Sequence, residues 1–256
     1  MEMLRIATFN TWNCQGPFDN RLPSMVAGLR ALGADVILLQ EVFAEAPSGL
    51  DVSAHLAGAL GMNTVYAPAR KKLRKLNDVP VLSHSGLAVL ARGPIGAHES
   101  VQLPDDERDG ERLGQMVQVK VRGVDVVIGN VHLSHLPGQD DLRRRQLVYL
   151  AEHLKRFGGD MLRFAGGDMN APAGHDIFDV LDGFTPLSVP GDGMRTTLNP
   201  VGGKPLQAGI IDHLFVSDPN GRVRETHVQV ALHQPDGVHG VFPSDHRAVV
   251  ADVALE

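Results

Sequence analysis

The sequence is poor in several residue types, and each scarcity excludes a class of protein. A single cysteine, Cys14, among 256 residues cannot form an internal disulfide, so the fold does not depend on an oxidising compartment. Phe, Trp and Tyr make up only 5% of the chain, which leaves few platforms for stacking the bases of a single-stranded nucleic acid. No apolar run approaches the roughly 20 residues that a membrane-spanning helix requires.

Positive charge is also in deficit. Lys and Arg number 24 against 30 Asp and Glu, and this net charge of −6 argues against a protein that grips nucleic acid with its whole surface. The chain opens with Glu2 where a secretory signal would be basic, and it leads directly into a strand-like run. We therefore expect a cytoplasmic protein without a stable membrane anchor, and the sequence indicates no protein partner.

The apolar fraction of 43% is enough for one large core, so we expect a single domain over residues 1–256. Short apolar runs alternate with stretches of helical period, which is the pattern of an α/β domain. The expected strands are Leu4–Phe9, Asp35–Leu39, Gly86–Ala91, Met116–Val121, Asp125–Val131, Met161–Ala165, Ile210–Val216 and Ala248–Leu255. The expected helices are 22–32, Val52–Leu60, 142–157 and His175–Leu181. The connections 66–84, 101–113 and 183–207 are long enough to be functional loops.

Polar side chains stand at the ends of several of these apolar runs. Asn10, Glu41 and His132 each follow a predicted strand, and Asp168 and Asn170 follow another through two glycines. The carboxyl ends of buried strands are where α/β sheets present their ligand-binding crevice.

The last two strands have their polar groups at the opposite end. Asp212 lies near the start of one, and Asp245 and His246 precede the other. If all these groups meet, those strands run antiparallel to the earlier ones and the sheet is mixed. Alternation along the strand places Asp212 and His213 on opposite faces, and we assign Asp212 to the site.

Taken singly, each of these residues has a simpler explanation. Asn10 and the segment 166–172 are typical of turns, Glu41 of a solvated helix or loop start, and His132 of a hydrogen-bonded core histidine. The spacing His132-x-x-His135 is compatible with zinc, but no cysteine cluster or second motif accompanies it. The joint occurrence of the polar strand ends favours an active site.

In combination, the segments resemble the endonuclease/exonuclease/phosphatase superfamily, which includes DNase I-like nucleases, sphingomyelinases and inositol polyphosphate phosphatases. The matching segments run from residue 7 to residue 246 in the family's order: Ala7-Thr8-Phe9-Asn10, Leu38-Leu39-Gln40-Glu41-Val42, Gly86-Leu87-Ala88-Val89-Leu90, Asn130-Val131-His132-Leu133, Gly167-Asp168-Met169-Asn170, Ile211-Asp212-His213-Leu214-Phe215-Val216 and Ser244-Asp245-His246. The resemblance implies a four-layer α/β/β/α sandwich of two mixed sheets flanked by helices.

The resemblance also implies a metal site that takes Mg²⁺ or Mn²⁺. Glu41 would be the main ligand, with Asn10 and Asp245 binding directly or through water, as suits a hard cation that prefers oxygen. The bound cation would counter charge on the phosphoryl oxygens and the leaving group.

The same resemblance implies roles for the remaining residues. Asp168 or His246 would deprotonate the attacking water, and Asp212 would hold the tautomer of His246. Asn170 would donate to a phosphate oxygen, and His132 would bind the phosphate or protonate the leaving oxygen.

The sequence departs from the family at two points. No carboxylate matches the partner that His132 has in DNase I-like members, since the 66–84 segment offers only Asp78. The usual Thr-Trp pair before the Asp212 strand is also missing, because Leu198 follows Thr196-Thr197.

The resemblance implies a phosphoesterase that we expect to act on phosphodiester bonds, and the sequence slightly favours nucleic acid as the substrate. The basic run 70–75 could track a phosphate backbone, with Arg70 and Lys71 as substrate-binding residues, or it could be a solvated charge run. The run Arg143-Arg144-Arg145 lies on a predicted helix flank and is expected to face solvent. The net acidity favours the alternative of a lipid or small phosphate ester. The alternative of another class is a binding module that has lost activity.

Overall fold

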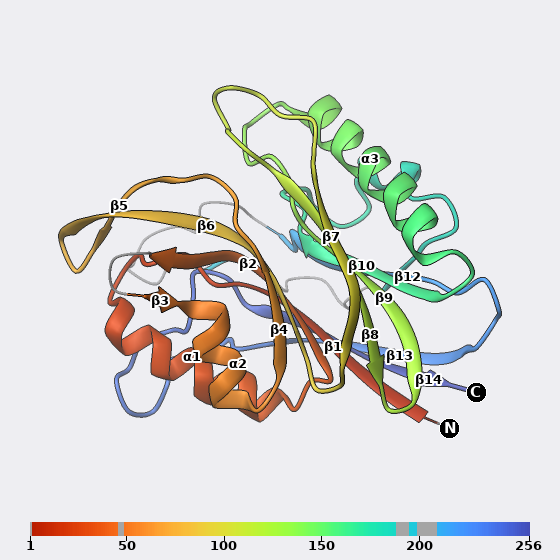
Figure 1. The fold of residues 1–256 in the computed structure, drawn as a ribbon, viewed down its shortest axis with the longest axis horizontal. Helices are drawn as coiled ribbons and strands as arrows, with labels where there is room; N and C mark the ends of the chain where they lie inside the picture. The colour runs from red at the N-terminus through yellow and green to blue at the C-terminus, as the bar shows by residue number, and fades with distance from the viewer. Residues whose placement is uncertain (1, 46–48, 188–194, 199–208) are drawn as a thin grey trace.

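The computed structural model describes residues 2–45, 49–187, 195–198 and 209–256. Two mixed β-sheets pack face to face, with helices covering their outer faces, so the predicted α/β/β/α sandwich is confirmed (Figure 1). Helices α1 and α2 lie on one side of the molecule and α3 on the other.

The first sheet has the strand order β13-β14-β1-β2-β6-β4, with β3 pairing to β2 and β5 to β6. Within it, β1 and β2 are parallel and β14 runs antiparallel to β1. The strands of this sheet are β1 (Glu2–Asn10), β2 (Val36–Glu45), β3 (Leu50–Asp51), β4 (Asn63–Ala67), β5 (Lys72–Leu76), β6 (Val79–Ala91), β13 (Val223–Ala231) and β14 (Ala248–Leu255).

The second sheet has the order β11-β12-β10-β9-β8-β7. Here β9 and β10 are parallel and β12 runs antiparallel to β10, as the placement of Asp212 predicts. Its strands are β7 (Ile95–Gln102), β8 (Leu113–Val121), β9 (Val124–His132), β10 (Leu162–Asp168), β11 (Thr185–Leu187) and β12 (Asp212–Ser217).

The helices follow the predicted apolar faces. Helix α1 (Phe18–Leu32) ends at Gly33, whose φ of 62° is the left-handed conformation that glycine adopts without strain. Helix α2 (Val52–Leu60) starts at Asp51, whose carboxylate accepts the backbone N–H of Ala54. Helix α3 (Asp140–Gly158) covers the second sheet, and Asp176–Val180 forms the short 3-10 helix η1 where an α-helical turn was expected.

The period of two along the strands divides the core into three layers. In β1, Leu4 and Ile6 face the second sheet, whereas Ala7 and Phe9 face α1 and α2. A third cluster packs α3 against the outer face of the second sheet. Both sheets are therefore covered on both faces, which explains the continuous apolar strands.

Several sequence predictions need correction. The segment 66–84 is a β-hairpin rather than a loop, because β5 and β6 pair from Lys72↔Ser83 to Leu76↔Val79. The 101–113 connection is shortened at both ends by β7 and β8. Much of 183–207 lies outside the described residues, but Thr185–Leu187 within it forms β11. Arg143 is buried, not solvent-facing, and donates to the carbonyls of Ser134 and Leu136.

No helix in the described ranges is long and apolar enough to span a membrane.

Candidate active site

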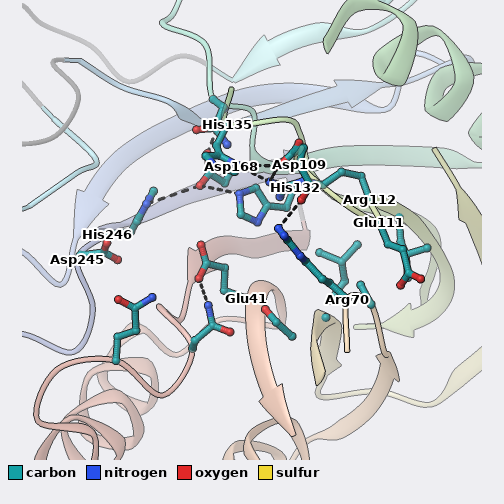
Figure 2. Close-up of a pocket in the computed structure, with 18 of the residues that line it drawn as sticks. Glu41, Arg70, Asp109, Glu111, Arg112, His132, His135, Asp168, Asp245 and His246 are labelled. Carbon is teal, nitrogen blue, oxygen red and sulfur yellow. Dashed lines mark hydrogen bonds and ion pairs between the residues drawn. The ribbon is translucent and has the colours of Figure 1, made fainter. Parts of the chain in front are cut away.

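Polar strand ends from both sheets face a common cavity of about 500 Å³ (Figure 2). Six of the eight residues singled out from the sequence line it: Glu41, His132, Asp168, Asn170, Asp245 and His246. The other two, Asn10 and Asp212, are fully buried behind the cavity and hydrogen-bond to residues that line it. The sheet register explains the convergence, since Asp168 pairs with His132 on one side and with Asp212 on the other.

Glu41 reaches the cavity through an irregularity in strand β2. The pairing of β2 with β6 shifts register between Leu39 and Val42, and Glu41 has a φ of 52°. A β-bulge of this kind re-aims a side chain that would otherwise follow the strand's alternation. Non-glycine residues rarely hold positive φ, so the surrounding structure must stabilise this conformation.

Two amide side chains hold the Glu41 carboxylate. Asn10 Nδ2 donates to one oxygen at 3.3 Å, and Asn13 Nδ2 donates to the other. The remaining oxygen of the second amide, Asn13 Oδ1, is buried and has no hydrogen-bond partner in the described part of the chain. An orphaned oxygen beside a carboxylate is the donor set that a hard divalent cation satisfies.

Asp168 occupies the centre of the site. It accepts the Asn10 Nδ2 hydrogen bond at 3.0 Å and the backbone N–H of Asn170 at 3.1 Å. His132 and His246 flank it, with Nε2 atoms 3.5 and 3.6 Å from Asp168 Oδ2. Burial raises the pKa of the Asp168 carboxyl to about 7, although the adjacent His246 opposes this shift.

His246 forms a buried dyad with Asp212. Its Nδ1 lies 2.9 Å from Asp212 Oδ2, which leaves Nε2 directed at Asp168. Burial disfavours the charged imidazole, but the carboxylates of Asp212 and Asp168 outweigh that cost and hold the pKa of His246 well above its usual value.

Asp245 supplies a further carboxylate on the cavity wall. Burial raises its pKa to about 6, and the negative charge of Glu41 adds to the shift. Its neighbour Ser244 donates to the main-chain oxygen of Asn10 at 2.7 Å, which ties the segment before β14 to the end of β1. Two carboxylates that face one cavity form a site that favours a cation.

His132 has the opposite electrostatics. Burial lowers its pKa well below the usual value, and the nearby Arg112 and His246 lower it further. Asp168 is the carboxylate beside it, a partner that the motifs did not suggest. Asp78, the alternative in the sequence, has a φ of 65° and lies between β5 and β6, where it lines a different surface hollow.

Of the three remaining residues predicted to bind substrate, Asn170 and Arg70 line the cavity and Lys71 does not. Asn170 lines the cavity, and its Nδ2 donates to the Leu133 carbonyl at 3.1 Å, which leaves one of its two N–H groups for a ligand. Arg70 also lines the cavity, whereas Lys71 is exposed and is not among the lining residues.

The described residues contain one group of acidic and imidazole side chains close enough to share a metal ion. Its members, Asp168, Asp212 and His246, present atoms within 4.8 Å of one another. His132 and His135 are not in this group, so no described arrangement supports the zinc interpretation of that pair. His135 instead pairs with the buried Asp109, with 2.7 Å between Nδ1 and Oδ1.

Strands β9 and β10 approach each other closely at Gly167, the residue before Asp168. Gly167 has a φ of 142°, and a Cβ there would lie 1.8 Å from the Val131 carbonyl oxygen in β9. Only glycine permits this approach. The glycine before Asp168 therefore sets the distance between Asp168 and His132.

A buried polar chain lies between the sheets behind the site. Gln40 Nε2 donates to Thr8 Oγ1 at 3.0 Å and to Asn130 Oδ1 at 2.8 Å. Asn130 in turn donates to the carbonyls of Leu39 and Ala88. Because Gln40 precedes Glu41 and Asn130 lies two residues before His132, this chain fixes the two sheets relative to each other beneath the cavity.

Two supporting residues could not be recognised from the motifs. Arg21 in α1 is fully buried and donates to the carbonyls of Thr11, Trp12, Asn13, Gln15 and Pro243. Thr196 Oγ1 accepts the backbone N–H groups of Ile211 and Asp212 at 3.0 and 3.3 Å. Thr196 thus holds the start of β12 even though the expected Thr-Trp pair is absent.

Comparisons with known proteins agree with the fold. The family model described as Endonuclease/Exonuclease/phosphatase family matches residues 8–246. A solved endonuclease/exonuclease/phosphatase from Beutenbergia cavernae DSM 12333 is 26% identical, with a TM-score of 0.77 over 100% of this chain and 72% of that one. Comparison with curated protein sequences finds no match.

Two further solved structures share the fold at lower identity. A truncated TDP2 from Caenorhabditis elegans is 18% identical with a TM-score of 0.73, covering 98% of both chains. A mannosyl-6-phosphatase from Bacteroides thetaiotaomicron VPI-5482 is 19% identical with a TM-score of 0.70, covering 98% of this chain and 99% of that one.

The sandwich and its site define a class of metal-dependent hydrolases that act on phosphate esters. This chain belongs to the endonuclease/exonuclease/phosphatase family.

Proposed function

We propose that this protein hydrolyses phosphodiester bonds with Mg²⁺ as its cofactor and Mn²⁺ as a substitute. The observation that carries the proposal is the division of the cavity between oxygen donors at Glu41, Asn13 and Asp245 and the buried Asp212–His246 dyad beside Asp168. The first group suits a hard cation, and the second suits proton transfer.

The oxygen donors around Glu41 fit a magnesium ion better than the Asp168, Asp212 and His246 group does. Asp212 Oδ2 is already engaged with His246 Nδ1, and an ion there would compete with the proton that the two carboxylates stabilise on the imidazole. Glu41, Asp245 and Asn13 Oδ1 would hold the cation, with Asn10 contributing through its amide or through water. When bound, the cation supplies positive charge that stabilises the phosphoryl oxygens and the leaving group.

We assign the general base to Asp168. Its pKa of about 7 matches the operating pH of a base that must take a proton from water and release it again. The alternative base, His246, is held protonated by Asp212 and Asp168, which suits donation of its Nε2 proton to a phosphoryl oxygen. Asn170 would donate its free N–H to the same phosphate, and neutral His132 would bind the phosphate from the other side.

The preference for nucleic acid over a small ester rests on the basic run. Arg70, Lys72 and Arg74 line the cavity, and Lys71 does not. Local cations support an anionic substrate, but they do not form the long track that a duplex would follow. A lipid or small phosphate ester therefore stays the second candidate, because a cavity of about 500 Å³ has room for a small molecule.

The test is hydrolysis of bis-p-nitrophenyl phosphate and p-nitrophenyl phosphate, together with plasmid DNA, single-stranded DNA, RNA, sphingomyelin and phosphoinositides. Each substrate is offered with Mg²⁺, with Mn²⁺ and with EDTA. The proposal requires diester cleavage that EDTA and Glu41→Ala abolish and that the exposed control Glu99→Gln on β7 retains. Cleavage that survives Glu41→Ala would refute the metal assignment, and binding of a substrate without cleavage under all conditions would refute the proposal of catalysis.

A further inference from the structure

One side of the cavity is cationic. Arg70, Lys72 and Arg74 come from β5 and the segment before it, and Arg112 comes from the connection that leads into β8. All four line the same cavity as the catalytic groups. Figure 2 shows Arg70 and Arg112 on the side of the cavity away from Asp245 and His246.

Strand alternation selects which members of the basic run face the cavity. Lys72 and Arg74 share a face with their partners Ser83 and Val81 in β6, and both line the cavity. Leu73, between them, is 69% exposed on the opposite face. The paired strand therefore directs both the exposed Lys72 and the half-buried Arg74 toward the cavity.

The existing partners of these cations leave most of their charge unneutralised. Arg112 is paired with the buried Asp109, with bonds of 3.1 and 2.6 Å. Arg70 donates to the main-chain oxygen of Asp109, and Arg74 donates to the Ser83 carbonyl at 2.8 Å. Carbonyl acceptors carry no formal charge, so the hydrogen bonds fix the guanidinium groups without cancelling them.

Two atoms are left without partners in the described ranges. Arg74 Nε is buried and makes no hydrogen bond, and Lys72 Nζ has no ion pair. Burial lowers the pKa of Lys72, and the nearby Arg70 and Arg74 lower it further. The exposed Glu111 on the rim is the additional acidic residue on this side. Like charges held together in this way indicate a site for an anion.

The proposed function places the scissile phosphate beside Asp168 and His246, and Arg70 and Arg112 lie on the side of the cavity away from His246 and Asp245. We propose that Arg70, Lys72, Arg74 and Arg112 form a subsite for a second phosphate group on the substrate, next to the one that is hydrolysed. Guanidinium groups match phosphate geometry through paired N–H donors, and Lys72 adds a mobile point charge. This subsite rests on the proposed function, since it takes the hydrolytic centre as the position of the first phosphate.

The second phosphate has two possible sources, which equilibrium binding separates. Isothermal titration in EDTA, where no turnover occurs, compares adenosine 3′,5′-bisphosphate with adenosine 5′-monophosphate as the small-molecule pair. The trinucleotide dTpdTpdT and the dinucleotide dTpdT form the strand pair. The subsite predicts that, in at least one pair, the member with two phosphate groups binds about tenfold more tightly than the member with one.

Variants on one strand provide the matched comparison. Lys72→Met is expected to remove most of the advantage of the second phosphate, with little effect on the ligand that has one phosphate group. Lys75→Met removes the same charge from the exposed side of β5, outside the cavity lining, and is expected to retain the advantage. A preference in the small pair alone identifies a small bisphosphate, and a preference in the strand pair identifies a polynucleotide.

Equal affinity within both pairs, or equal losses in Lys72→Met and Lys75→Met, would overturn the subsite. Hydrolysis of bis-p-nitrophenyl phosphate by the same preparations keeps the two proposals apart. If hydrolysis depends on Glu41 but ligands with two phosphate groups bind no more tightly than ligands with one, the subsite alone is rejected. A preference that persists in a protein without hydrolytic activity would reject the proposed function alone.

Discussion

His246 Nδ1 lies 2.9 Å from Asp212 Oδ2, and both side chains are buried. This hydrogen bond fixes the ring so that Nε2 faces Asp168. The carboxylate also stabilises the imidazolium, which is the form that we assign to phosphate binding.

Asp212→Asn is expected to lower kcat by about 10³-fold to 10⁴-fold, as loss of an orienting carboxylate does in other catalytic dyads. The variant should also move the alkaline limb of the pH–rate profile to lower pH, because the imidazolium loses its main stabilising charge. A purely structural role for Asp212 would leave the position of that limb unchanged. The exposed Asp179→Asn serves as the control in the same assay.

Magnesium affinity is expected to depend on the protonation of Asp245. Its pKa in the folded, metal-free protein is raised to about 6 by burial and by Glu41, so the cation must displace a proton at lower pH. Affinity should fall about tenfold for each pH unit below that value and level off above it. Titration calorimetry in buffers of different ionisation enthalpy measures the released proton. An affinity that is independent of pH would remove Asp245 from the ligand set.

The raised pKa of Asp245 also predicts how the unfolding free energy of the metal-free protein depends on pH. A carboxyl whose folded pKa lies above its ordinary value of 3.8 favours the folded state below that value, and this contribution is lost as the pH rises to about 6. Asp245→Asn should flatten the dependence of the unfolding free energy on pH over this range in EDTA. A steeper dependence in the variant would contradict the direction of the shift.

Gly167→Ala is expected to destabilise the protein by about 3 kcal/mol or more and to reduce activity. The added Cβ would lie 1.8 Å from the Val131 carbonyl oxygen, so β9 and β10 must separate and carry His132 and Asp168 apart. Urea denaturation gives the free energy, and Gly58→Ala in α2 is the control. Its Cβ would meet open space, so a gain of about 0.5–1 kcal/mol is expected there. An unchanged free energy of unfolding in Gly167→Ala would show that β9 and β10 can move apart at little cost.

Arg21→Met should cost about 3–5 kcal/mol of unfolding free energy, because five carbonyl oxygens lose their donor. The same variant should weaken Mg²⁺ binding, since Arg21 connects the segment around Asn13 to the carbonyl of Pro243 before Asp245. Denaturation and metal titration check the two effects, with the exposed Arg145→Met as control. Stability lost without any change in metal affinity would limit Arg21 to a structural role.

The sequence predicts much of the site because its residues end long apolar strands, which the two-residue period reveals. The sequence does not identify residues that matter because they are buried, since the pattern of neighbouring residues does not reveal that burial. Arg21 lies on an amphipathic helix where arginine usually faces solvent, and Asn13 lies in a turn of left-handed residues beyond β1. Strand β5 escapes recognition because Lys72–Leu76 is mostly charged, and it forms through pairing with β6.

The most direct test of the metal site is anomalous diffraction from crystals soaked in Mn²⁺. We predict a peak between Glu41 and Asp245, about 2.1–2.3 Å from the Glu41 carboxylate. A peak coordinated instead by Asp168, Asp212 and His246, or no peak in the cavity, would contradict the assignment of Glu41 as the principal ligand.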